Sequence, residues 1–204
     1  MKAAGENVTV NSEEERLVRE ARSGNLKAFS ALVEASQEKM IHTAFSFLGN
    51  MEDAEDVAQE AFVNAYRSLP PFNERSRFST WLYRLLVNHC KDFLRQKKVR
   101  QHLNTFWGRK TDEEADPVLE LAASTPSPRQ ELVDRELEKE IRSALDKLPF
   151  QQKSVFTLRY LEGLKLEEIS GILDLSTGAV KAHLWQAAQK MKIILQPHFP
   201  GGGD

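Results

Sequence analysis

Residues 53–100 decide the fold of this chain, and they read DAEDVAQEAFVNAYRSLPPFNERSRFSTWLYRLLVNHCKDFLRQKKVR. The pattern predicts an acidic amphipathic helix, a break at Pro70 and Pro71 with a polar loop, and then a long helix. Residues 51–62 hold five acids and no Lys or Arg, a net charge of −5, whereas residues 81–100 hold six bases and one acid, a net charge of +5. Two surfaces of opposite charge indicate two different partners, and the basic one indicates a nucleic acid.

The composition bounds the class of protein. The chain has 204 residues, enough for one or two domains, and its overall net charge of −2 hides the local segregation of charge. Cys90 is the single cysteine, so no disulfide framework forms within the chain, and a reducing compartment is expected. No apolar signal segment and no membrane-length apolar run occurs, which predicts a cytoplasmic protein without membrane insertion.

Residues 12–100 are predicted to form a first, all-α domain of four helices. Residues 1–11 are expected to be disordered, and Ser12 with Glu15 has the spacing of a capping box that opens the first helix. Asn50 is positioned to cap the acidic helix, and Ser79 is expected to cap the long helix after the loop. No segment with the alternation of a strand is present, so the fold class is predicted to be all-α.

Residues 101–130 are predicted to be a linker, because acids and a Thr-Pro-Ser-Pro run replace the helical periodicity. A flexible chain of this length spans roughly 30 Å when relaxed and about 100 Å when fully extended, so it would leave the spacing of two domains open. Phe106 and Trp107 stand out in this polar segment. They either dock on one of the two domains or insert into a groove of a partner.

Residues 131–195 are predicted to form a second helical domain, with residues 196–204 as a tail. Residues 166–184, LEEISGILDLSTGAVKAHL, have the spacing of a helix-turn-helix motif. Such a motif places the N-terminal half of its second helix in the major groove of DNA, although an ordinary helical hairpin is the alternative. With Ser176 as the N-cap, the side chains placed on the reading face are Ser176, Thr177, Lys181, His183, Leu184 and Gln186.

The order of these patterns resembles the extracytoplasmic-function (ECF) sigma factors, a subfamily of the sigma-70-type RNA polymerase sigma factors. The acidic helix and the TWLYRL-containing helix resemble region 2 of that family, and residues 145–184 resemble region 4, so the resemblance covers residues 12–195. It implies that the acidic helix docks on core RNA polymerase. The positions that match are Asp53, Asp56, Gln59, Glu60 and Phe62; the acids otherwise form a solvated helix face, and Phe62 a core residue.

The same resemblance implies that the loop and the long helix melt and read the minus-ten promoter element. A base taken out of the stack is stabilised by aromatic and basic side chains. The matching positions are Phe72, Asn73, Arg75, Ser76, Arg77, Trp81 and Asn88, with burial of Trp81 against Leu82 or Phe45 as the alternative. Phosphate contacts are expected from Arg84, Lys91, Arg95, Lys97, Lys98 and Arg100, and readout of the minus-thirty-five duplex from the residues at 176–186 named above.

Three departures from the family pattern affect these expectations. The loop reads FNERSRF where the family commonly has Arg-Gly after the first Phe. The recognition helix carries His183, Gln186 and Ala188 at positions that are often Arg, so its readout relies more on hydrogen bonds. Lys165 and Asp174 occupy positions where a capping Ser or Thr and a Gly are common, which predicts a weaker cap but the same fold.

An enzyme is not expected. The five histidines are scattered without the spacing of metal ligands, and no glycine-rich phosphate loop occurs, so neither a cofactor nor a metal site is predicted. The resemblance further implies an anti-sigma protein as a partner. The main alternative is a helix-turn-helix regulator that binds duplex DNA without becoming a polymerase subunit, and a helical adaptor without a DNA role is the third possibility.

Overall fold

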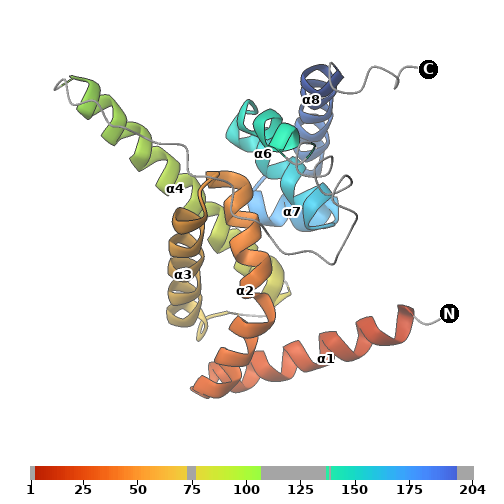
Figure 1. Cartoon of the computed structure of the whole chain (residues 1–204). Helices are drawn as coiled ribbons and strands as arrows, with labels where there is room; N and C mark the ends of the chain where they lie inside the picture. The colour runs from red at the N-terminus through yellow and green to blue at the C-terminus, as the bar shows by residue number, and fades with distance from the viewer. Residues whose placement is uncertain (1–2, 73–76, 107–136, 138, 197–204) are drawn as a thin grey trace, which may run out of the picture.

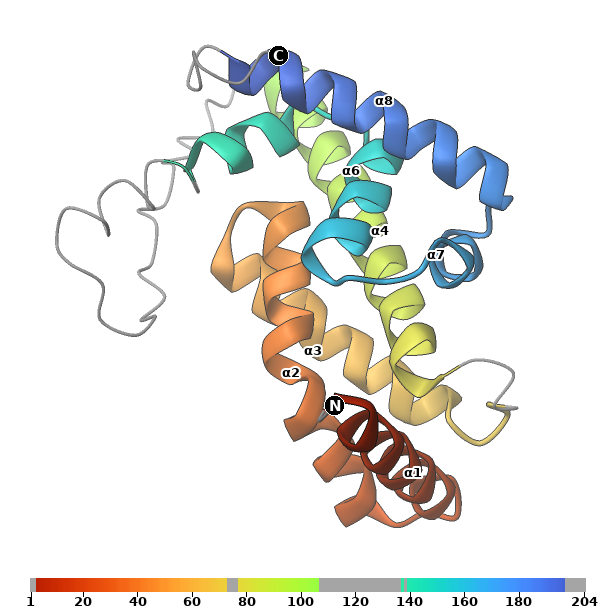
Figure 2. The ribbon, with the colours of Figure 1, turned by 90° about the vertical axis from the view of Figure 1, so that its right-hand side faces the viewer.

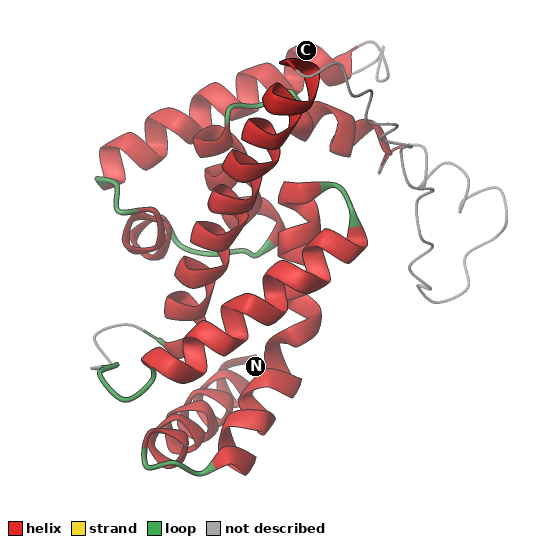
Figure 3. Ribbon diagram, turned by 90° about the vertical axis from the view of Figure 1, so that its left-hand side faces the viewer, coloured by secondary structure: helices red, strands yellow, loops and turns green. Residues whose placement is uncertain are grey.

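The computed structural model describes residues 3–72, 77–106, 137 and 139–196, with the side chains of residues 3–12 and 104–106 excepted. Throughout these residues every regular element is helical and the loops between helices are short (Figure 3). The prediction of an all-α fold is therefore confirmed. Two helical units follow one another along the chain, as the colour order in Figure 1 shows.

The first unit contains α1 (Ala3–Arg22), α2 (Leu26–Leu48), α3 (Met51–Ser68) and α4 (Phe78–Phe106). The Asn50 side chain caps α3 as predicted, since its Oδ1 accepts a hydrogen bond of 2.8 Å from the Asp53 amide. Asn25 caps α2 in the same way, and Gly49 ends α2 in the left-handed conformation with φ 75°. The acidic helix ends at Ser68, and only Leu69 separates it from the two prolines that were predicted to stop it.

Three boundary predictions for the first unit are wrong. Helix α1 begins at Ala3, so Ser12 lies inside the helix and does not cap it. No proline interrupts residues 3–12, and a helix that is already nucleated extends at little cost per residue. Helix α4 begins at Phe78, so Ser79 falls in its first turn, and it continues to Phe106 because residues 101–106 contain no proline or glycine.

The second unit contains a helical segment at 139–146, α6 (Phe150–Phe156), a π-helical turn η1 (Thr157–Leu161), α7 (Leu166–Leu173) and α8 (Thr177–Leu195). The helix-turn-helix predicted over residues 166–184 is confirmed: it consists of α7, a turn at residues 174–176 and the first part of α8. The Ser176 hydroxyl accepts a hydrogen bond of 3.1 Å from the Ala179 amide. Asp174 ends α7 with φ 54°, a left-handed conformation that Asp tolerates better than most residues. No described helix has both the length and the apolar character that crossing a bilayer requires.

The two units pack directly against each other and share one hydrophobic core. Buried side chains of α2, α3 and α4 form one cluster with Val155, Leu158, Ile169, Ile172 and Val180 of the second unit. Helix α7 lies against α4, and α8 crosses above them, as Figure 2 shows. The linker prediction left the spacing of the units open, whereas the structure joins them. Most of the predicted linker, including Trp107, lies outside the described residues, and so does the tail at 197–204.

Candidate nucleic-acid and protein-binding surfaces

The acidic face of α3 adjoins the basic helix α4. Asp56, Gln59 and Glu60 are exposed, while Asp53 is half-buried. Asp53 Oδ2 lies 3.5 Å from Lys97 Nζ on α4, and Glu60 Oε2 lies 3.5 Å from His89 Nδ1 on α4. The acidic and basic surfaces therefore meet along the α3–α4 contact, and the acids remain accessible to a partner on their outer side.

An apolar groove lies beside this acidic face, between α2 and α3. Its volume is about 410 Å³. Gln59 and Phe62, two of the predicted docking residues, both line it. Phe62 also packs against the hydrophobic core, which agrees with the core alternative, while its role in docking stays a prediction. The other residues that line the groove are Phe29, Val33, Gln37, Ile41, Glu55, Ala58, Val63 and Tyr66.

Val63 and Tyr66 were missed from the sequence although they belong to this surface. They are 43% and 41% exposed, and together with Phe62 they form a continuous apolar surface along the groove. The Tyr66 ring packs on Phe29 of α2 with 5.1 Å between centroids. The signal was present in the sequence, because residues 59, 62, 63 and 66 follow the helical period on one side of α3.

An aromatic cluster supports the start of α4. The Trp81 ring lies 4.8 Å from Phe72 and 5.8 Å from Phe78, measured between centroids. Phe72 and Phe78 are buried, whereas Trp81 is half-buried. Trp81 also packs against the hydrophobic core that contains Leu82, which agrees with the burial alternative, and its ring neighbours are Phe72 and Phe78. Arg77 is exposed beside it, and the predicted site residues Asn73, Arg75 and Ser76 lie outside the described residues.

A basic row runs along the exposed side of α4. Four bases and an amide lie at steps of four, three, four and three residues, which places them on one face of the helix. All five side chains are exposed, and no acid occupies a position of the row. Asp92, next to the row, pairs with Arg95 at 3.3 Å. Lys97 lies off the row and pairs with Asp53, and Arg100 is exposed beyond its end. The row consists of Arg84, Asn88, Lys91, Arg95 and Lys98.

The predicted reading residues of α8 do not all face outward. Ser176, Thr177, Lys181 and Gln186 are exposed, and Gln186 Oε1 accepts a hydrogen bond of 2.9 Å from Gln152. Leu184 is half-buried and packs against the shared core, as expected for a residue at the partly exposed edge of the reading face.

His183 is also half-buried, and its Nδ1 is buried from solvent without a partner in the described part of the chain. A hydrogen bond from His183 to a base would therefore have to use the other ring nitrogen.

Trp185 is the residue on α8 that sequence reasoning missed. It is 66% exposed, and it lies one helical turn after Lys181 on the same side. The spacing of Lys181, Trp185 and Gln189 was visible in the sequence, but large apolar residues are normally assigned to the core. An exposed indole next to a lysine on a recognition helix offers both an apolar surface and a hydrogen-bond donor to a base edge.

The described residues offer no cluster of three His, Cys, Asp or Glu side chains that could hold a metal ion. The Cys90 side chain is fully buried, and burial raises the pKa of its thiol to about 12. A thiol that stays protonated is a poor nucleophile.

Comparison with known proteins identifies related chains over both units. The family model described as sigma-70 region 2 matches residues 32–100, and the one described as sigma-70, region 4 matches residues 138–191. The ECF RNA polymerase sigma-E factor of Haemophilus influenzae is 33% identical over 90% of this chain and 96% of its own. The ECF RNA polymerase sigma factor SigW of Bacillus subtilis is 31% identical over 86% of this chain and 92% of its own. Among solved structures, CnrH in complex with the cytosolic domain of CnrY matches with a TM-score of 0.66 and 25% identity, over 91% of this chain and 98% of CnrH.

Proposed function

This chain belongs to the ECF RNA polymerase sigma factors, and we propose that it directs core RNA polymerase to promoters that are read at two elements. The observation that carries the proposal is the exposed basic row of α4, which begins one turn after Trp81. A row of bases next to an accessible aromatic ring is suited to a separated DNA strand, whose phosphates and unstacked bases lie side by side.

Core polymerase docks on α3. Exposed Asp56, Gln59 and Glu60, with half-buried Asp53 beside them, supply charge and hydrogen-bond acceptors. The groove beside them supplies apolar area at Phe62, and desolvated apolar centres with a polar rim are the usual anatomy of protein interfaces. The docking partner is therefore a surface with bases around an apolar centre.

The minus-ten element is melted at the start of α4. Trp81 supplies the ring on which a base stacks, and the buried Phe72 supports Trp81 from behind. Arg77 and the loop residues Asn73, Arg75 and Ser76 contact the strand, and Asn88 reads it from within the basic row. Phosphates are bound by Arg84, Lys91, Arg95, Lys98 and Arg100; Lys97 joins them only after releasing Asp53.

The minus-thirty-five element is read as duplex by α8. Ser176, Thr177 and Lys181 enter the groove first, because they lie at the N-terminus of the helix. Trp185 and Gln186 follow one turn later, with His183 at the edge. Arg is absent from this helix, so discrimination depends on hydrogen bonds and apolar contacts more than on counterion release.

An anti-sigma protein is the third partner that we propose. CnrH, a structural neighbour at 25% identity, was solved in complex with the cytosolic domain of CnrY. An anti-sigma protein bound to the face formed by α3 and its groove would compete with polymerase for that face. Addition of core polymerase should then release the bound anti-sigma protein in a pull-down experiment.

The decisive experiment is initiation of transcription by purified chain and core polymerase. Templates are selected from a random promoter library, so that no promoter sequence has to be assumed. We expect the chain to produce transcripts that core polymerase alone does not make. Tight binding to duplex promoters without any gain in initiation would instead support the regulator that binds DNA independently of polymerase.

A further inference from the structure

The half-buried Glu162 joins the two helical units through two part-buried hydrogen bonds. Its Oε2 accepts a hydrogen bond of 2.5 Å from the Tyr83 hydroxyl on α4. Its Oε1 lies 2.6 Å from the Thr43 hydroxyl on α2, whose one proton is shared between Glu162 and the Lys39 carbonyl at 2.7 Å. Both hydroxyl-bearing side chains are buried. Burial and the neighbouring Glu162 raise the pKa of Tyr83, so its hydroxyl remains a donor. Hydroxyl-to-carboxylate hydrogen bonds are roughly twice as strong as neutral ones.

Lys153 makes a second polar connection between the units. Its side chain is 6% exposed, and Nζ donates a hydrogen bond of 3.1 Å to the Phe47 carbonyl while pairing with Asp146 at 2.7 Å. Phe47 lies in the last turn of α2, where carbonyl groups have no partner within the helix. A positive charge at this end of a helix also interacts favourably with the helix dipole. Lys153 therefore caps a helix of the other unit.

The π-helical turn η1 places Glu162 where it can make these contacts. The Glu162 amide donates a hydrogen bond of 3.2 Å to the Thr157 carbonyl, a step of five residues in place of the usual four. The Thr157 hydroxyl is buried and has no partner among the described residues. Such turns are rare and concentrate at functional sites. The unpartnered Thr157 hydroxyl costs some local stability. The wider turn in exchange brings the Glu162 carboxylate to the contact between the units.

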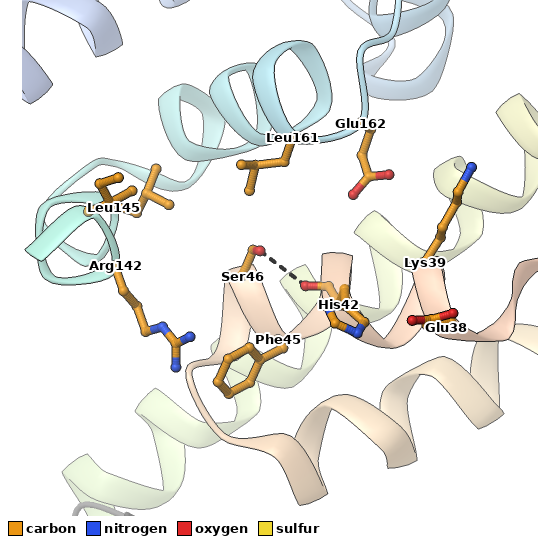
Figure 4. A pocket seen from close by; sticks show the side chains of 10 residues that line it. Glu38, Lys39, His42, Phe45, Ser46, Arg142, Leu145, Leu161 and Glu162 are labelled. Carbon is orange, nitrogen blue, oxygen red and sulfur yellow. Dashed lines mark hydrogen bonds between the residues drawn. The ribbon is translucent and has the colours of Figure 1, made fainter. Parts of the chain in front are cut away.

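The contact beside Glu162 is incompletely packed. A cavity of about 510 Å³ separates α2 from the second unit, with Glu162 and Lys39 at one end and Arg142 at the other (Figure 4). At that other end the Arg142 guanidinium lies 4.0 Å from the centroid of the Phe45 ring. The apolar contacts of the shared core supply attraction between the units, whereas directional bonds such as those of Glu162 and Lys153 fix how the units sit.

The closed arrangement cannot place both units on a promoter at once. The minus-ten and minus-thirty-five elements lie about 25 base pairs apart, or roughly 85 Å along a straight duplex. Helix α7 packs against α4, and α8 follows α7 after only Asp174, Leu175 and Ser176, a reach of about 11 Å. The recognition helix is thus held beside the strand-reading helix, far short of that separation.

We propose that Glu162 and Lys153 form an intramolecular latch that holds the free chain closed and that opens when the units separate on the promoter. The contacts between the units support the latch itself. The consequence of the latch for transcription initiation rests on the proposed function. Loss of the latch shifts the free chain toward an open form with separated units. The latch then sets how much of the chain is ready to engage a promoter.

Fluorescence energy transfer between the units tests the latch in the full chain. Ser30→Cys on α2 and Gln151→Cys on α6 provide exposed labelling positions, and the buried Cys90 stays unlabelled. Tyr83→Phe and Thr43→Val each remove one hydroxyl with little change in shape, and Lys153→Met removes the charge but keeps the stem. We expect Tyr83→Phe to shift the closed–open equilibrium about tenfold toward the open form, which lowers the transfer efficiency.

The matched control is Glu167→Gln, which neutralises an exposed carboxylate on α7 and should leave the transfer efficiency unchanged. Circular dichroism establishes that each variant retains its helical content. If Tyr83→Phe, Thr43→Val and Lys153→Met all give the efficiency of Glu167→Gln, the latch is excluded. If the transfer efficiency stays high in a complex that initiates transcription, the units do not separate and the opening step is excluded. If the wild-type chain does not initiate transcription at all, the proposed function is contradicted. The measurements on the free chain then still decide whether the latch exists.

Discussion

Single side chains on the candidate surfaces divide by exposure into those that can touch a partner and those that support them. Phe72 is 7% exposed and supports the Trp81 ring, so it acts indirectly. The Trp185 side chain is 66% exposed and can touch a partner directly. The reading surface of α8 predicted from the sequence included the half-buried Leu184 but omitted Trp185, which is the more exposed of the two. Exposure of one residue in a helix depends on which neighbour the helix packs against, and the sequence of α8 does not contain that neighbour.

Trp185→Ala should weaken binding to minus-thirty-five duplex by about tenfold, since one good contact to a base edge is worth about 1–3 kcal/mol. Stability should barely change because the side chain is exposed. Ile193→Ala is the control, since Ile193 is 68% exposed on the same helix but lies near its C-terminal end. Fluorescence anisotropy with labelled duplexes measures both variants. Equal losses from both would mean that Trp185 acts through the fold and not through DNA.

Cys90 should make the protein less stable in alkaline solution. Its thiol pKa is raised from 9.0 to about 12 by burial, so the unfolded chain loses the proton first as the pH rises. The stabilisation is fully present below pH 9 and falls by about 1.4 kcal/mol near pH 10. Urea unfolding of the wild-type chain and of Cys90→Ala at pH 7 and pH 10 isolates this contribution. A difference in unfolding free energy between the two chains that stays constant with pH would contradict it.

At the scale of the helix, α3 and α4 form a pair in which opposite charges adjoin. Sequence predicted both charge blocks and both helices, because acids, bases and apolar residues recur at helical spacing within each segment. The contact between the blocks, such as Asp53 with Lys97, depends on how the helices cross and was not predictable. The groove between α2 and α3 also depends on how two helices are placed relative to each other, because each helix contributes only one wall.

Charge reversal on α3 tests polymerase docking. Asp56→Arg with Glu60→Arg should weaken binding to core polymerase at least tenfold, because both side chains are exposed on the proposed docking face. The control Glu34→Arg with Glu167→Arg reverses the same number of exposed charges elsewhere. Surface plasmon resonance with immobilised core polymerase gives both affinities. Unchanged affinity in the α3 variant, with native circular dichroism, would place the docking face elsewhere.

The basic row of α4 should set the dependence on salt and not on sequence. Lys98→Ala should weaken binding to all promoter strands alike and reduce the slope of log affinity against log salt by about 0.7–0.9. Gln186→Ala should instead change which minus-thirty-five sequences are preferred. Selection from a promoter library at two salt concentrations separates the two effects. If Lys98→Ala and Gln186→Ala both weakened binding equally for all sequences, this division of roles would be wrong.

At the scale of the whole molecule, one core joins the two units. Ile169 of α7 is fully buried in the cluster that includes Leu82 and Leu86 of α4. The units should therefore unfold together in the free chain, although the linker sequence by itself would allow them to be independent.

Ile169→Ala tests this coupling. It should lower the free energy of unfolding by about 2–5 kcal/mol and destabilise both units together. Trp81 in the first unit and Trp185 in the second report separately when each is retained as the only tryptophan. Coincident urea transitions are expected from the two fluorescence probes. Two separate transitions, with Ile169→Ala moving only that of Trp185, would show that the units are stabilised independently.

The sequence by itself determined the all-α class, the order of the two units and several helix ends. The ends at Asn50, before Pro70 and around Asp174–Ser176 are set by caps, prolines and turns, which act between residues close together in the chain. Only the tertiary structure decided the groove, the exposure of Trp185 and the contact between the units. Glu162 and Thr43 are 119 positions apart, and their hydrogen bond exists only because packing of the shared core brings η1 to α2. Burial of apolar surface is non-directional, so a periodic pattern predicts that a helix is packed but not which helix it packs against.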